Sequence, residues 1–299
     1  MSIRAIKRVS QSKPTIEGAG VHLRRAFGFG NTSDFDPFLL FDDFRNDNPE
    51  EFLAGFPWHP HRGIETITYV LSGEVEHGDS LGNRGTLGSG DVQWMTAGSG
   101  IMHQEMPKGD ARGRMHGFQL WANLPASLKM TSPRYQDVAG RDIPEAVEDD
   151  GTRVRVVCGE FWGQKGPVEG VAADPRYLDV RVPPGKRRTL PVETTRHAFA
   201  YVFEGSGSFR DASDPQPVKT DRVGSDEPVY ETGNRSLVLF DRGDEVVVQA
   251  GEQGIRFLLV SGRPLEEPVA WYGPIVMNTQ EELRQAVAEL QDGTFIRKG

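Results

Sequence analysis

The segment ETITYVLSGEVE, residues 65–76, decides the fold class of this chain. Thr, Ile, Tyr and Val alternate along it until Gly73 interrupts the run, which predicts two strands joined by a Ser-Gly turn. A second segment, AFAYVFEGSGSF at 198–209, has the same pattern, and superposing the two aligns Gly73 with Gly205. We therefore expect two strand–glycine–strand hairpins, one in each of two copies of a β-sandwich unit.

The composition agrees with an all-β fold. The chain has 299 residues, enough for two domains, and it contains 35 glycines and 20 prolines. Such a turn-rich globular composition is typical of sandwiches and barrels built from many short strands. Further strands are predicted at 91–95, 115–124, 152–161, 176–182, 236–240, 245–249 and 255–261.

A polar, proline-bearing stretch near residue 138 separates the two predicted domains, residues 1–138 and 139–299. One helix is expected at about 279–292, because Thr279 and Glu282 form a capping-box pair and Gly293 follows the last apolar residue. Its apolar positions share one face, so we expect this helix to dock on the protein. Residues 211–234 are polar and predict a long exposed hairpin loop, a candidate contact surface.

Charge and cysteine content exclude several classes of protein. The net charge is −9 and no basic cluster is present, which argues against direct binding of nucleic acid. The short basic spots Arg24–Arg25 and 186–188 are interpreted as solvated. The single cysteine, Cys158, rules out an intrachain disulfide and thiolate zinc sites. No apolar run approaches 18 residues, so we expect no membrane association and a cytoplasmic location. We also expect a monomer.

Two short motifs carry metal-binding chemistry, His59-Pro60-His61 and His103-Gln104-Glu105. Residues at i and i+2 of a strand point to the same face, so each motif can present two donor groups together. An isolated H-x-H pair is often two surface histidines. A hairpin and a glycine-rich turn lie between these two motifs, however, as expected for adjacent strands of one barrel. The sequence therefore predicts one metal site made of His59, His61, His103 and Glu105.

Three imidazoles and one carboxylate suit Fe(II), Mn, Co, Ni, Cu or Zn, and affinity alone does not choose among them. An octahedral ion bound in this way keeps two open positions. In the aligned second copy, Pro191 and Glu193 stand at the places of His59 and His61. We therefore expect one metal ion per chain.

Several long stretches resemble the pirin family of the cupin superfamily. They are HPHRGIETITYVLSGEVEH (59–77), GDVQWMTAGSGIMHQEMP (90–107), DPFLLFDDF (36–44), HGFQLWANLP (116–125) and PVAWYGPIVMNTQEEL (268–283). The resemblance extends over roughly residues 15–292. It implies two tandem cupin domains, of which the N-terminal one binds a metal, typically iron, through three His and one Glu. Those ligands fall on the same four residues, His59, His61, His103 and Glu105.

The resemblance leaves two functions open. Some pirins resemble quercetin 2,3-dioxygenases, which open the central ring of a flavonol with O₂ and release CO. Others bind proteins, as transcription cofactors or as regulators of metabolic enzymes, without turnover. The fold does not decide between these.

For the enzyme hypothesis, either Glu105 or Glu65 is the candidate general base. Glu65 and His116 are further candidates for side chains that contact the metal ligands or line the cavity. We expect apolar lining from Phe56, Trp94 and Phe118, and we expect His22 and His77 at the surface.

Overall fold

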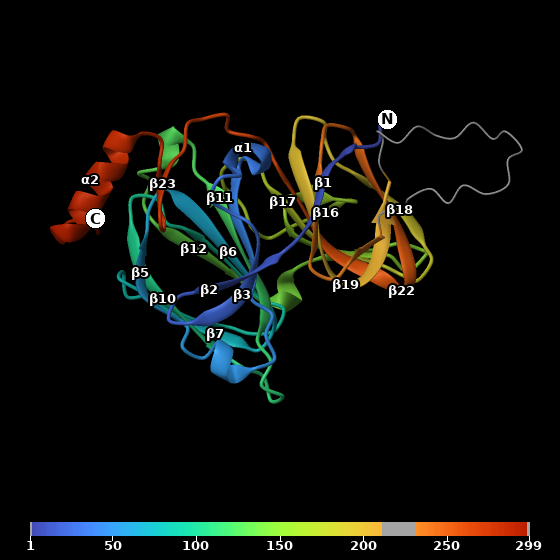
Figure 1. Ribbon diagram of the computed structural model, residues 1–299, viewed down its shortest axis with the longest axis horizontal. Coiled ribbons are helices and arrows are strands. Elements are labelled where there is room, and N and C mark those ends of the chain that lie inside the picture. The colour runs from blue at the N-terminus through green and yellow to red at the C-terminus, as the bar shows by residue number, and fades with distance from the viewer. Residues whose placement is uncertain (1, 211–230, 298–299) are drawn as a thin grey trace, which may run out of the picture. The chain divides into compact units, whose positions relative to one another are not determined.

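The computed structural model describes residues 2–210 and 231–297 (Figure 1). These residues form two compact units. The amino-terminal unit contains residues 12–143, 167–174 and 264–297. The carboxy-terminal unit contains residues 2–11, 144–166 and the described part of 175–263. Strands dominate both units, so the predicted all-β class is confirmed.

Two antiparallel sheets make up most of the amino-terminal unit. The larger sheet has the strand order β12-β9-β6-β11-β4-β3-β2 and the smaller one β5-β10-β7-β8. The strands of the larger sheet are β2 (Lys13–Glu17), β3 (Val21–Phe27), β4 (Phe38–Asp43), β6 (Ile64–Ser72), β9 (Val92–Thr96), β11 (His116–Asn123) and β12 (Arg134–Val138). The strands of the smaller sheet are β5 (Phe56–His61), β7 (Glu74–Asp79), β8 (Arg84–Leu87) and β10 (Ile101–Lys108). Short helical turns connect them, namely α1 (Thr32–Phe35), η1 (Pro49–Glu51), η2 (Ala126–Leu128) and η3 (Gly140–Asp142).

The carboxy-terminal unit is built on one extensive sheet with the order β1-β21-β19-β22-β17-β14-β13, to which β18 and β20 add at β22 and β19. Its strands are β1 (Ile6–Gln11), β13 (Glu145–Val147), β14 (Arg153–Cys158), β17 (Arg176–Val182), β18 (Arg187–Pro191), β19 (His197–Phe209), β20 (Glu231–Gly233), β21 (Ser236–Phe240) and β22 (Glu245–Gly262). A small pair, β15 (Glu160–Phe161) and β16 (Gln164–Lys165), completes the unit. Inward-facing Val, Leu and Phe side chains of these strands form one apolar core.

Neither predicted hairpin forms in the structure. In the first segment, β6 and β7 meet at Gly73, whose φ of +88° suits a tight turn, but they do not pair, because β6 belongs to the larger sheet and β7 to the smaller one. The second prediction is wrong, because residues 197–209 form the single strand β19. Gly205, at φ +65°, bends this strand at a register shift instead of reversing it. The long strand β22 runs alongside both halves of β19 and keeps them in one ladder.

The compact units differ from the predicted division at residue 138, because each unit includes one end of the chain. Strand β1 pairs with β21 in the carboxy-terminal unit. The small pair β23 (Ala270–Tyr272) and β24 (Ile275–Met277) and the helix α2 (Gln280–Gln291) belong to the amino-terminal unit. Burial of Leu283 and Ala286 against β23 and β24 holds the helix there.

The predicted capping box of α2 is confirmed, since the Thr279 side chain accepts from the Glu282 backbone and the Glu282 side chain accepts from the Thr279 backbone. Among the described residues, no helix is long and apolar enough to cross a membrane. The loop predicted at 211–234 falls mostly outside the described residues, and only its last part is seen, as β20.

Candidate metal centre

The two histidine motifs lie on neighbouring strands of the smaller sheet. His59 and His61 are on β5, and His103 is on β10, directly opposite His59 in the antiparallel register. Side chains of directly paired residues point to the same face, and so do those two residues apart on one strand. The local sequence therefore aims three imidazoles at one point.

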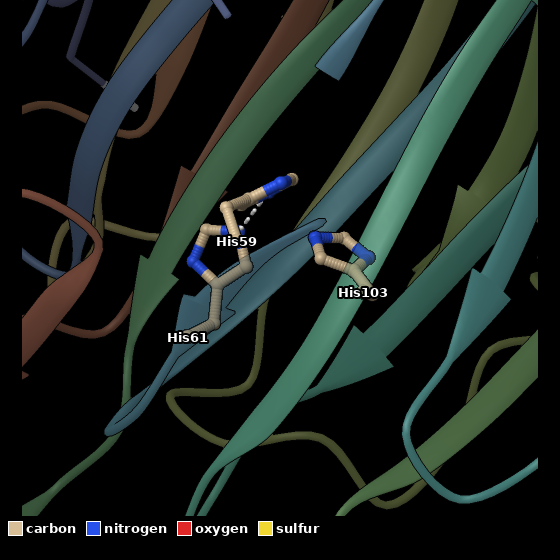
Figure 2. A group of neighbouring side chains, drawn as sticks. All are labelled: His59, His61 and His103. Carbon is tan, nitrogen blue, oxygen red and sulfur yellow. Dashed lines mark hydrogen bonds between the residues drawn. The ribbon is translucent and has the colours of Figure 1, made fainter. Parts of the chain in front are cut away.

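Figure 2 shows these three rings gathered together. Their ring centroids lie 4.4 Å apart for His59 and His103 and 4.9 Å apart for the other two pairs. The Nε2 atoms of His59 and His61 are 3.1 Å apart. One nitrogen from each ring falls within 4.8 Å of the others, and in the described part of the chain this is the group that could hold a metal ion.

The hydrogen bonding of these rings fits a metal ion. The Nδ1 atom of His59 lies 2.9 Å from the carbonyl oxygen of Pro57 and donates to it, so its Nε2 carries the lone pair that can coordinate a metal. Both ring nitrogens of His103 are buried and lack a hydrogen-bond partner among the described residues. Unpaired polar atoms in a buried place carry a desolvation cost, which a bound cation would offset.

The ionisation of the rings also suits metal binding. Burial lowers the pKa of His59, and it lowers the pKa of His61 and His103 well below the usual value, with further lowering from the neighbouring rings. The carbonyl oxygen of Pro274 acts in the opposite direction on His61. The three imidazoles are therefore neutral near pH 7, the form in which histidine binds metals.

Glu105, the fourth predicted ligand, lies beside this group and not within it. It follows His103 on β10 after a shift in the register with β5. The Thr68 hydroxyl lies 3.3 Å from Glu105 Oε1 and 2.7 Å from Gln119 Oε1. Burial raises the pKa of Glu105 to about 7, and the contact with Thr68 opposes that shift. The role of Glu105 as a ligand stays a prediction.

The imidazoles of His59 and His61 line a cavity of about 470 Å³ within the amino-terminal unit. This volume falls in the range of small-molecule sites. His59, His61 and Glu105 line the cavity, together with Gly273 and Pro274 from the turn between β23 and β24. The rest of the lining is largely apolar and includes Val21, Leu23, Phe29, Leu40, Phe44, Phe52, Phe56, Trp58, Val75, Met115 and Trp121.

Glu65 does not face the cavity. It is buried and accepts a hydrogen bond from Thr96 at 2.8 Å, whereas Thr68, three positions along β6, lines the cavity. Counting even steps from His61 fails because Gly63, at φ +76°, separates two strands of different sheets. Glu65 is therefore placed where it cannot act as the base for a ligand in this cavity.

Of the three residues predicted to line the cavity, only Phe56 does so. Phe118 and Trp94 are buried but do not line the cavity. Their strand neighbours Gln119 and Gln93 point to the inner face of the sheet, so Phe118 and Trp94 point to the opposite face. His116 is also outside the cavity.

Three further histidines lie outside the metal group. His116 Nε2 lies 2.6 Å from an Asp47 carboxylate oxygen, an arrangement that needs no metal. His22 is half-exposed, as predicted. His77 was expected at the surface but is buried, with its Nε2 atom 2.9 Å from the side-chain nitrogen of Gln93.

Sequence reasoning missed the polar residues of the cavity wall. Thr68, Gln119 and Asp42 are polar residues on the largely buried strands β6, β11 and β4, where most of their neighbours are apolar. An unexplained polar residue inside an otherwise buried strand was the available signal. The Pro274 carbonyl beside His61 had no signal in the sequence, because backbone atoms carry no side-chain identity.

Comparison with known proteins identifies the family of this chain. The Pirin family profile matches residues 20–122, and the profile of the Pirin C-terminal cupin domain matches residues 177–296. The chain belongs to the pirin family. The predicted tandem arrangement of two cupin domains is thereby confirmed.

Relatives of this pirin cover almost all of its length. A pirin-like protein of Caulobacter vibrioides is 44% identical over 99% of this chain and 100% of its own. Human pirin is 37% identical over 94% of this chain and 90% of its own. A crystal structure of quercetin 2,3-dioxygenase from Acinetobacter baumannii superposes with a TM-score of 0.85 at 30% identity, covering 98% of this chain and 99% of the other.

Proposed function

We propose that this pirin is a non-heme iron dioxygenase of the quercetin 2,3-dioxygenase type. A group of three neutral imidazoles, of which His59 and His61 line a largely apolar cavity, is the observation that carries the proposal. Similarity to the quercetin 2,3-dioxygenase of Acinetobacter baumannii supports the substrate class. In the proposed reaction both atoms of O₂ enter the ring-opened product, and one ring carbon leaves as CO.

His59, His61 and His103 would hold one Fe(II) ion, with Glu105 as the fourth ligand or as a base beside it. Bound iron supplies Lewis acidity and vacant coordination positions. The chain provides neutral donors without a competing proton, because burial keeps the imidazole pKa values low. Two of the three rings are buried, which excludes bulk water from the donors.

Glu105 is the residue suited to remove the proton of the flavonol 3-hydroxyl group, because its carboxyl group lines the same cavity as His59 and His61. In the metal-free protein, burial raises the pKa of Glu105 to about 7, and a bound cation would favour the ionised form that accepts a proton. Thr68 restrains the carboxylate through its hydroxyl group. Phe56, Trp58 and Trp121 offer aromatic faces for a planar ligand in the same cavity.

The test is turnover of quercetin by protein loaded with Fe(II) under anaerobic conditions and then exposed to O₂. We expect loss of the flavonol absorbance, O₂ consumption and CO release in equal amounts. The matched controls are metal-free protein and the His103→Ala variant. CO release no greater than in these controls would refute the proposal. It would favour the alternative, a metal-dependent regulator that binds other proteins.

A further inference from the structure

A row of polar side chains crosses the inner face of the larger sheet in the amino-terminal unit. Asp42 on β4 pairs directly with Arg25 on β3 and with Gln119 on β11. Gln119 in turn pairs with Thr68 on β6. Directly paired residues share a face of the sheet, and all four line the cavity. The row therefore runs from Thr68, beside Glu105, to an ionic group at Asp42.

The ionic group contains one guanidinium and two carboxylates. Arg25 donates from Nε and Nη2 to the two oxygens of Asp42, at 2.8 and 2.7 Å. Its Nη1 atom lies 2.8 Å from Glu17. The Arg25 side chain is only 20% exposed, so the expectation that Arg24–Arg25 is a solvated spot is wrong for Arg25. Two negative charges against one positive leave this end of the cavity with a net negative charge.

Within the described part of the chain, Asp42 retains unused capacity to accept hydrogen bonds. An ionised carboxylate offers about four lone-pair sites, of which Arg25 fills two. Asp42 is 5% exposed and lines the cavity, so its remaining sites are accessible to a ligand in the cavity. Burial raises the pKa of Asp42 to about 6 while Arg25 opposes the shift, so the carboxylate is ionised at pH 8. A ligand that donates hydrogen bonds at this point would satisfy it.

We propose that Asp42, held by Arg25 and Glu17, determines substrate specificity by accepting hydrogen bonds from hydroxyl groups at the end of the substrate away from the histidines. This inference rests on the proposed function, because it takes the ligand to be a flavonol seated at the metal centre. Two strand spacings separate Asp42 from Thr68, a distance of about 10 Å. A planar molecule of three rings spans that distance, and a single ring does not.

The charge of the group narrows the ligand class further. Neutral hydroxyl groups can donate to Asp42, whereas an anionic substituent at that end would meet the net negative charge of Asp42 and Glu17. The favoured substrate is therefore a flavonol with phenolic hydroxyl groups on its outer rings. Flavonols that lack them, or that carry a carboxylate there, bind more weakly.

The experiment compares two ligands in two variants of the full chain. Quercetin and 3-hydroxyflavone, which has no hydroxyl groups on its outer rings, are titrated anaerobically at pH 8 into metal-loaded protein, with quenching of tryptophan fluorescence as the readout. Asp42→Asn is expected to weaken quercetin binding about tenfold and to leave 3-hydroxyflavone within about twofold. Equal weakening of both ligands, or no change in either, overturns the proposal.

The matched control is Asp179→Asn. Asp179 accepts from Arg256 Nε and Nη2 at 2.9 and 2.7 Å, and Arg256 Nη1 lies 2.8 Å from Glu204, so the same ionic arrangement recurs in the carboxy-terminal unit. Asp179 alternates with the core residues Leu178 and Val180 and therefore faces away from that core. This variant is expected to leave the affinities for both flavonols unchanged. Loss of ligand discrimination here as well would count against a specific role for Asp42.

A measurement on the unaltered protein keeps the proposal falsifiable if Asp42→Asn does not fold. We expect the wild type to bind quercetin at least about tenfold more tightly than 3-hydroxyflavone, and equal affinities overturn the inference. A different outcome refutes the proposed function. Quercetin that binds with this discrimination but releases no CO refutes the dioxygenase and leaves the role of Asp42 intact. Turnover of quercetin without tighter binding than 3-hydroxyflavone refutes the role of Asp42 and leaves the dioxygenase proposal intact.

Discussion

Arg62, the residue after His61, donates from Nη2 to the carbonyl oxygen of Phe295, which lies 233 positions further along the chain. The same guanidinium donates to the Ser99 carbonyl at 2.7 Å and to Glu289 of α2 at 2.7 Å. One side chain thus ties the end of β5 to the turn before β10 and to the C-terminal helix. Both histidine-bearing strands are anchored through Arg62.

Replacing Arg62 with Ala should destabilise the amino-terminal unit by about 3 kcal/mol, because two buried carbonyl groups and the partly buried Glu289 carboxylate lose their donor. Arg284→Ala on the same helix is the control. Arg284 pairs with Glu281 in an exposed position, so its removal should cost less than about 0.5 kcal/mol. Urea unfolding of the two variants measures the difference, and equal midpoints would show that Arg62 does not anchor the strands.

At Gly63 the β5–β6 turn packs directly against the backbone of the C-terminal segment. A Cβ atom at Gly63 would lie 1.9 Å from the carbonyl oxygen of Val276, and the φ of +76° already disfavours a side chain. Gly63→Ala should therefore destabilise the protein by more than about 2 kcal/mol. Gly82→Ala is the control, because Gly82 has a φ of +91° and no atom within 4 Å of an added Cβ. Its cost of about 1 kcal/mol reflects the strained backbone conformation alone. A cost at Gly63 no larger than at Gly82 would mean that the turn relaxes freely.

Removal of a metal-site imidazole should abolish metal binding. We expect His59→Ala and His103→Ala to retain less than about a tenth of the wild-type metal, measured by elemental analysis after dialysis, since the structure brings three donors together. His116→Ala is the matched control and should keep full stoichiometry, because His116 pairs with Asp47 outside the cavity. Stoichiometric metal in the His103 variant would falsify the assignment of the site.

The pH dependence of stability reports the ionisation of Glu105. Burial raises its pKa from 4.5 to about 7, so between these values the folded metal-free protein binds more protons at this site than the unfolded chain. The contribution of Glu105 to stability is thus full below pH 4.5 and is lost as the pH rises through 7. In metal-free protein, Glu105→Gln should gain stability relative to wild type as the pH rises from 5 to 8, by up to about 3 kcal/mol.

Urea unfolding at intervals across this pH range measures that difference. A bound cation favours the ionised carboxylate, so metal loading at pH 8 should stabilise the wild type more than Glu105→Gln. A difference between the two proteins that stays constant from pH 5 to 8 in the absence of metal would show that Glu105 does not titrate there.

Local sequence determined strand β6, the start of helix α2 and the placing of His59 and His61 on one face of a strand. Alternating β-branched and aromatic residues specify β6, and the capping box specifies the start of α2, since both depend on neighbours a few positions away. The spacing of His59 and His61 places both rings on one face for the same reason. Strand alternation is a local property, so these features could be read without the tertiary structure.

Tertiary structure decided everything that depends on strands meeting from distant parts of the chain. Alternation does not carry across the Gly63 turn, so only the fold shows that Thr68 faces the cavity and Glu65 does not. Likewise, the continuous β19 depends on β22 supporting both of its halves. The ionic group at Asp42 and the anchoring of Arg62 by the C-terminal helix arise from pairings between separate segments, and side-chain spacing along the sequence does not encode them.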